Sequence, residues 1–90
     1  MNVLFMYKGE LTHIQFKFWG DSLEVVLDRI ETAEIIGCDG DKAIIEGEVY
    51  SKGVIMWLLS QMEFLEVIRP ESLRQKMKEK IEKMYKLYNE

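Results

Sequence analysis

The sequence is poor in the residue types from which catalytic and metal centres are usually built. Its 90 residues include one histidine, His13, one cysteine, Cys38, and one proline, Pro70. A single cysteine cannot form a disulfide within the chain, which favours a reducing, cytoplasmic compartment. Zinc sites need several cysteine or histidine ligands at set spacings. We therefore expect no metal, no other cofactor and no enzymatic activity.

Long apolar runs and an excess of basic charge are also missing. No segment approaches the roughly 20 apolar residues of a membrane-spanning helix, and MNVLFMYKGE lacks the basic start of a signal peptide. The net charge of −4 divides into −6 up to Arg69 (6 Lys/Arg, 12 Asp/Glu) and +2 from Pro70 onward (6 Lys/Arg, 4 Asp/Glu). Because nucleic-acid binding usually requires a basic surface, we expect neither direct DNA contact nor membrane association.

Other polar groups have plain explanations. His13 lies on the polar side of an alternating segment, so an exposed strand histidine is favoured over a catalytic base. The carboxylates within residues 39–48 lack the ligand spacing of a calcium loop. An anion site of the acylphosphatase kind needs an arginine near residues 20–22, where the sequence reads Gly-Asp-Ser.

What the chain does have is apolar material, at 48% of its residues, with 11% aromatic. That is enough for one modest core in one domain. We expect residues 1–10 to be a linker or strand from an upstream region, residues 11–69 to form the core, and residues 70–90 to add an amphipathic helix.

Alternating apolar residues predict the strands. Residues 11–19 alternate, residues 33–50 read as a hairpin around the turn signal Asp39-Gly40, and residues 64–69 form a last strand. The side chains expected to face inward are Ile14, Phe16, Phe18, Ala43, Ile45, Gly47, Val49, Leu65 and Val67.

Helical periods predict three helices between and after these strands. In residues 21–32 the apolar positions share one face, and Asp21 is the expected N-cap. Residues 52–62 are apolar nearly all round, which predicts a short, deeply packed helix with Trp57 and Leu58 as core anchors. After Pro70, the third core anchor, a stripe of Leu73, Met77, Ile81, Met84 and Tyr88 predicts the terminal helix.

The order β-α-β-β-α-β-α indicates an α+β fold of the ferredoxin-like kind, a βαββαβ sandwich with an additional C-terminal helix. Two helices would cover one face of an antiparallel sheet. The other face would carry six apolar side chains, which we take as the candidate interface or ligand face: Trp19, Ile36, Ile44, Tyr50, Phe64 and Ile68. Such a face is a liability if left bare, so either the terminal helix or another chain or domain must cover it.

An ordered set of motifs resembles a known family. VIMWLLSQMEFLEVIRPESLRQKM places an apolar helix with Trp57 before a strand, Pro70 and a helix that ends near Tyr88. Upstream, MYKGELTHIQFKF and VLDRI resemble the family's entry strand and first helix. Together these segments are similar to the C-terminal WCX domain of bacterial WYL-domain transcriptional regulators, over nearly the whole chain from about Met6.

The resemblance implies a regulatory, non-catalytic domain that contributes to dimerisation and to the response to an effector. Its implied partners are a second copy and the WYL and helix-turn-helix domains of the full-length regulator. The sequence carries neither of those two domains. It also reads Ser60-Gln61-Met62 where many relatives have a glycine, so we expect this turn to be built differently. The alternative function is a ferredoxin-like sensor of a small ligand, which the order of elements also permits.

Overall fold

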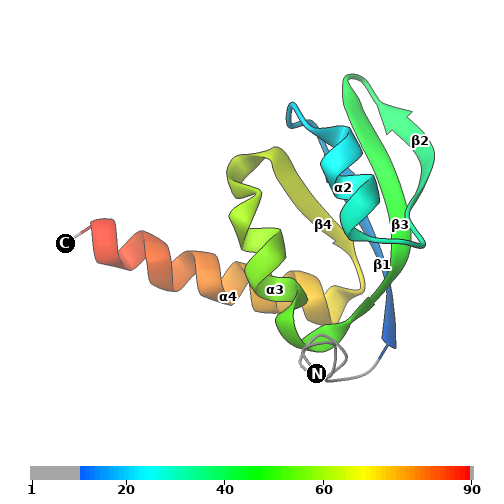
Figure 1. Cartoon of the computed structure of the whole chain (residues 1–90). Helices are drawn as coiled ribbons and strands as arrows, with labels where there is room; N and C mark the ends of the chain where they lie inside the picture. Colours follow the sequence, from blue (N-terminus) through cyan, green and yellow to red (C-terminus); the bar gives the residue numbers. More distant parts are fainter. Residues whose placement is uncertain (1–10, 90) are drawn as a thin grey trace.

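The computed structural model describes residues 11–89, apart from the side chains of residues 51 and 52 (Figure 1). Our prediction of a linker or strand in residues 1–10 lies outside that range. The described part has the element order β1, α2, β2, β3, α3, a short 3-10 turn η1, β4 and α4. This confirms the α+β class and the predicted alternation of strands and helices.

Four strands form a single antiparallel sheet in the order β2-β3-β1-β4. The strands are β1 Leu11–Phe18, β2 Glu34–Asp39, β3 Lys42–Tyr50 and β4 Leu65–Arg69. The hairpin between β2 and β3 turns at Gly40, whose φ of 66° is a left-handed value that glycine adopts at little cost. The central strand β1 therefore pairs with β3 on one side and β4 on the other, and β2 and β4 are the edges.

The helices are α2 Leu23–Arg29, α3 Ser51–Ser60 and α4 Glu71–Tyr88, with η1 at Met62–Phe64. Figure 1 shows α2 and α3 on the same face of the sheet, which we call the inner face. The N-cap of α2 is Ser22 and not the predicted Asp21. The backbone carbonyl of Ser22 accepts hydrogen bonds from the N–H groups of Val25 and Val26. The helix therefore starts one residue later than an N-cap at Asp21 would place it.

The core lies between the inner face and the helices. The predicted inward side chains of β1 are all buried, and the ring of Phe16 meets Trp57 edge-on at 6.4 Å between centroids. The buried apolar residues are Ile14, Phe16, Phe18, Val26, Ile30, Ile45, Val54, Leu58, Leu65, Val67, Leu73 and Met77. Helix α3 is less deeply packed than predicted, because Met56 is 75% exposed on its outer side.

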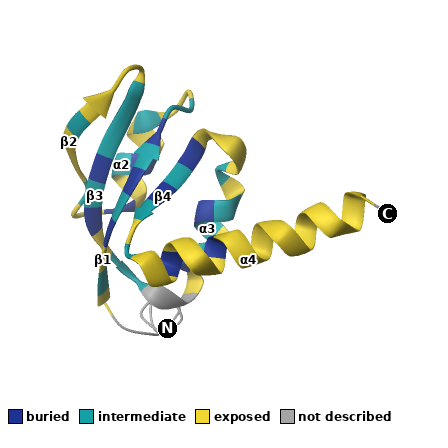
Figure 2. Ribbon diagram, turned by 180° about the vertical axis from the view of Figure 1, so that it is seen from behind, coloured by how far each residue is buried: buried dark blue, intermediate teal, exposed yellow. Residues whose placement is uncertain are grey.

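The terminal helix α4 lies beside the β4 edge and does not fold across the outer face of the sheet (Figure 2). Only Leu73 and Met77, in its first two turns, are buried. Arg74 Nη1 fastens this end by donating to the carbonyl oxygen of Val67 at 2.7 Å and to Glu66 Oε2 at 3.1 Å. The sequence allowed either the terminal helix or another chain or domain to cover the outer face. The position of α4 excludes the terminal helix.

Gly47 permits the close approach of the segment after α2 to strand β3. A Cβ at position 47 would lie 2.9 Å from Ile30 Cγ2 and 3.2 Å from the Ala33 backbone. The same approach lets the Thr32 hydroxyl oxygen accept the Glu48 N–H at 2.7 Å. Residues 30–33 can therefore seal this end of the core only if position 47 has no side chain.

Gly47→Ala should lower the free energy of unfolding by about 1–3 kcal/mol, because overpacking displaces a well-packed neighbour. Urea unfolding followed by circular dichroism measures the loss. Gly37→Ala is the matched control, since a Cβ there meets only Ile44 Cδ1 at 3.9 Å. Equal losses for the two variants would show that glycine is not needed at position 47 for packing.

The turn between α3 and β4 places Met62 in the left-handed region, with φ at 57°. Met62 belongs to the Ser60-Gln61-Met62 turn, which we expected to be built differently. A side chain in this conformation costs roughly 1–2 kcal/mol relative to the right-handed one. The turn therefore keeps a backbone shape suited to glycine while carrying an exposed methionine.

Met62→Gly should raise the free energy of unfolding by up to about 1 kcal/mol, since the relief of strain exceeds the entropy that glycine adds to the unfolded chain. The control is Met56→Gly, at an equally exposed methionine inside α3, which should cost about 1 kcal/mol. Thermal and urea unfolding of both variants give the comparison. If Met62→Gly lowered the free energy of unfolding as much as Met56→Gly does, the backbone at position 62 would not be strained.

Candidate interaction surface

The outer face of the sheet is the surface that the sequence singled out. Register fixes which side chains it carries, because Phe16 and Ile45 pair on the inner face and their neighbours alternate with them. Lys17 and Ile44 are therefore register partners on the outer face, as are Gln15 and Glu46. Figure 2 looks onto this face, over which no described helix lies.

An ion pair crosses the face near the end of the sheet that carries the β2–β3 hairpin turn. Lys17 Nζ on β1 lies 2.9 Å from Asp39 Oδ2 on β2, so the lysine reaches over the intervening strand β3 beside Ile44. The hydrogen bond and the positive charge of Lys17 hold the pKa of Asp39 below 3.8, and the carboxylate raises the pKa of Lys17 above 10.5. The lysine stem thereby covers apolar surface and keeps its charge in water.

Three further contacts of polar side chains lie on the outer face. Lys42 Nζ lies 4.2 Å from the centroid of the Trp19 ring, a cation–π contact. His13 Nε2 lies 3.2 Å from Glu46 Oε1, and the Gln15 amide donates to the same oxygen at 3.4 Å. His13 is thus an exposed strand histidine held by a carboxylate, as the alternating pattern indicated.

These contacts explain where the six candidate interface residues lie. Trp19, Ile44, Tyr50 and Ile68 are half-buried among polar neighbours, whereas Ile36 and Phe64 are 46% and 38% exposed. The two exposed residues lie on opposite edges of the sheet, Ile36 within β2 and Phe64 directly before β4. The outer face is therefore a mosaic of charged and apolar side chains.

The three predicted core anchors all lie on the helical side of the molecule. Leu58 is 1% exposed, and Trp57 is half-buried against Phe16. Pro70 is the N-cap of α4, so the terminal helix begins directly after it.

A groove between β4 and α4 is a feature that sequence reasoning missed. Leu65, Val67, Met77 and Ile81 contribute to its lining, but the first three are buried in the core and only Ile81 is exposed. The lengths of the two elements could have indicated that α4 extends beyond β4. The five residues of β4 span about 17 Å at 3.3 Å each, whereas the 18 residues of α4 span about 27 Å at 1.5 Å each. The helix must therefore extend well beyond the strand beside which it lies.

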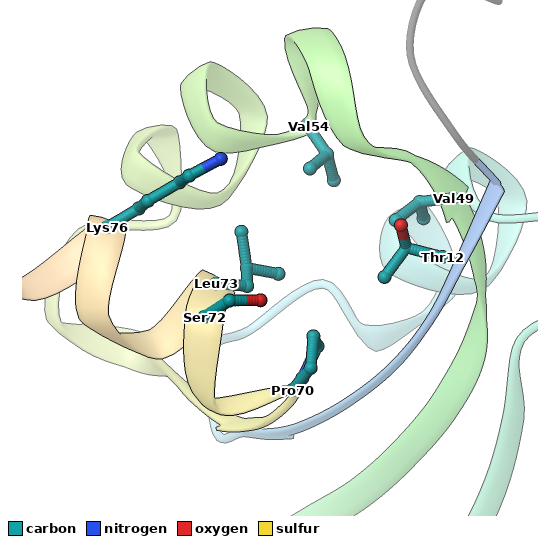
Figure 3. Close-up of a pocket in the computed structure, with 7 residues that line it drawn as sticks. All are labelled: Thr12, Val49, Val54, Pro70, Ser72, Leu73 and Lys76. Carbon is teal, nitrogen blue, oxygen red and sulfur yellow. The ribbon is translucent and has the colours of Figure 1, made fainter.

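A second hollow lies where β1, β3 and the first turns of α3 and α4 meet (Figure 3). Thr12, Val54 and Leu73 line it, and Lys76 closes one side. Its volume of about 50 Å³ is far below the roughly 300–1,000 Å³ of small-molecule sites. This hollow is too small for a metabolite.

Within residues 11–89, no group of three or more His, Cys, Asp or Glu side chains is arranged to hold a metal ion. Cys38 is an exposed thiol on the edge strand β2. None of the described helices is both long enough and apolar enough to cross a membrane.

The Lys17–Asp39 pair predicts a pH dependence of stability. Because folding lowers the pKa of Asp39, its contribution is present above pH 3.8 and is lost as the pH falls through the folded pKa. Wild type should therefore be more stable than Asp39→Asn at pH 7, and this difference should vanish near pH 2. Asp41→Asn, an exposed neighbour in the same turn, is the control. A difference between wild type and Asp39→Asn that persists unchanged at pH 2 would contradict the ion pair.

Comparison with known proteins gave one match. The family model described as the WCX domain matches residues 12–85, which is most of the chain. No curated protein and no solved structure matches it. The matched segment runs from β1 into the last turn of α4 and includes the predicted motifs around Trp57 and Pro70. The chain therefore belongs to the WCX domain family, the regulatory domains associated with WYL-type regulators.

Proposed function

We propose that this chain is the C-terminal regulatory domain of a WYL-type bacterial transcription regulator and that it acts by protein contacts without catalysis. The WCX match over residues 12–85 carries the proposal. The acidic body supports it, because a net charge of −6 up to Arg69 suits contact with protein better than contact with DNA. The regulator's other domains would then bind the DNA, and the chain would act in the cytoplasm.

For the fold we propose the ferredoxin-like class. In support, β1-α2-β2 and β3-α3-β4 are two split βαβ units whose strands interleave in the order β2-β3-β1-β4. Helices α2 and α3 lie together on one face, and α4 is the additional element. This class leaves the outer face of the sheet available to a neighbour.

We assign the outer face to contacts with the WYL and helix-turn-helix domains of the regulator. Its support is the uncovered sheet with Ile36 and Phe64 exposed at the two edges. Between them lie both signs of charge, including Lys17, Asp39 and Glu46. A polar surface with scattered apolar side chains is typical of interfaces between domains of one chain, which are more polar than permanent subunit interfaces.

The second role that we propose is to pair subunits, and the chain itself should show it. Sedimentation equilibrium at several loading concentrations should give a molecular mass that rises from one chain toward two. The same measurement in high salt should retain the dimer if apolar contacts dominate. A chain that stays monomeric at every concentration would remove the pairing role and leave only the contact with the other domains.

Ligand sensing, the alternative function, can be tested on the same preparation. A ligand that binds the folded state raises the melting temperature, and the rise grows with the logarithm of the ligand's excess over its dissociation constant. We expect amino acids and nucleotides at millimolar concentration to leave the melting temperature unchanged. A specific and saturable rise with one of them would favour the sensor function.

A further inference from the structure

One row of side chains along α4 runs from the hollow of Figure 3 to the exposed end of the helix. Leu73 and Lys76 line the hollow, and Lys80, Met84 and Leu87 follow them at spacings of three and four residues. Such spacings keep side chains on one side of a helix. Met84 and Leu87 are 48% and 74% exposed, so residues 11–89 leave the apolar end of this row largely uncovered.

Strand β1 begins beside the other end of the row. Thr12, the second residue of β1, lines the same hollow as Leu73 and Lys76. Figure 3 shows the Thr12 and Leu73 side chains across the hollow from each other. The chain that precedes β1 therefore joins the described structure beside the first turns of α4, where the row starts.

The sequence before β1 contains an apolar run that needs a cover. Five apolar residues follow one another from Val3 to Tyr7, and the described range begins shortly after them at Leu11. Adjacent apolar side chains with no polar residue between them are a liability when they face water. The run and the uncovered end of the α4 row thus have the same need, and they belong to one chain.

The lengths of the two segments match. An extended chain spans about 3.3 Å per residue, so Tyr7 and Val3 can reach about 17 Å and 30 Å from Thr12. Helix α4 rises about 1.5 Å per residue, which puts Met84 and Leu87 about 17 Å and 21 Å beyond Leu73. The apolar run can therefore reach the exposed apolar end of the row.

We propose that residues 3–7 of this chain lie along α4 and cover Met84 and Leu87. The covalent connection favours this occupant over a separate partner, because a segment on a short linker has an effective concentration in the millimolar range. The stems of Lys76 and Lys80 line the path with methylene groups while their ammonium groups stay in water. The contact does not depend on the proposed function, although in the proposed regulator it would fasten α4 to the connection from the upstream domains.

A double-mutant cycle in the 90-residue chain tests the contact. Phe5→Ser and Leu87→Ser should each lower the melting temperature by at least about 4 °C, the shift typical of a modest loss of packing in a domain of this size. The double variant should lose clearly less than the sum, because either change alone removes the same contact. Additive losses at positions 5 and 87 would overturn the proposal.

Met56→Ser is the control for this cycle. Met56 is 75% exposed on the outer side of α3, away from the row. Its effect on the melting temperature should therefore add in full to that of Phe5→Ser. Circular dichroism checks that every variant is folded before it is heated.

Disulfide formation locates the segment. In a Cys38→Ser background, which removes the one native thiol, Phe5→Cys with Leu87→Cys should close a disulfide within one chain under oxidised glutathione. Mass spectrometry should then show a single chain that has lost two hydrogens. Phe5→Cys with Tyr85→Cys places the second thiol about 200° around the helix and should not close.

Two results of the disulfide experiment would contradict the assigned contact. Equal closure at positions 85 and 87 would reflect random collision of the tethered segment. A disulfide between positions 5 and 87 that joins two chains on a non-reducing gel would place the segment on a second copy. Non-additive melting losses together with selective closure at position 87 within one chain support the proposal.

Discussion

Burial of one face of the central strand β1 is the constraint on which the rest of the structure depends. Ile14, Phe16 and Phe18 point to the same side, and the first two are fully excluded from solvent. A chain of 90 residues can bury only one face of a four-stranded sheet well. Helices α2 and α3 therefore gather on that side, and the opposite face is left to polar and half-buried side chains.

The small size of the core also explains why most of the terminal helix is exposed. Once Leu73 and Met77 have joined the core, none of the other apolar side chains that α4 carries is buried against the described part of the chain. Its C-terminal half therefore extends away from the sheet with its apolar stripe exposed. A domain of this size gains stability by sharing surface with a partner. We therefore assign the surfaces that its own core leaves exposed to regulation and pairing.

Much of the fold follows from local patterns. Alternation in residues 11–18 and 42–50 predicted the inward side chains, and Gly40 predicted the hairpin turn. The errors arose where several local choices were close in energy, as at the N-cap of α2, where Ser22 replaces Asp21. Met62 was missed as a left-handed residue because methionine carries no signal for that conformation, which the surrounding connection imposes on it.

For the surfaces, the sequence by itself determined which side chains share a face, since period 2 in strands and period 3.6 in helices are properties of the backbone. It also determined the acidic body, the apolar stripe of α4 and the motifs that mark the WCX family. Only the tertiary structure decided that Lys17 reaches Asp39 across β3 and that Arg74 fastens α4 to the edge of β4. Those contacts join residues far apart in the chain or on different elements. Their partners are fixed by strand order and by the direction in which α4 leaves Pro70, which no local pattern contains.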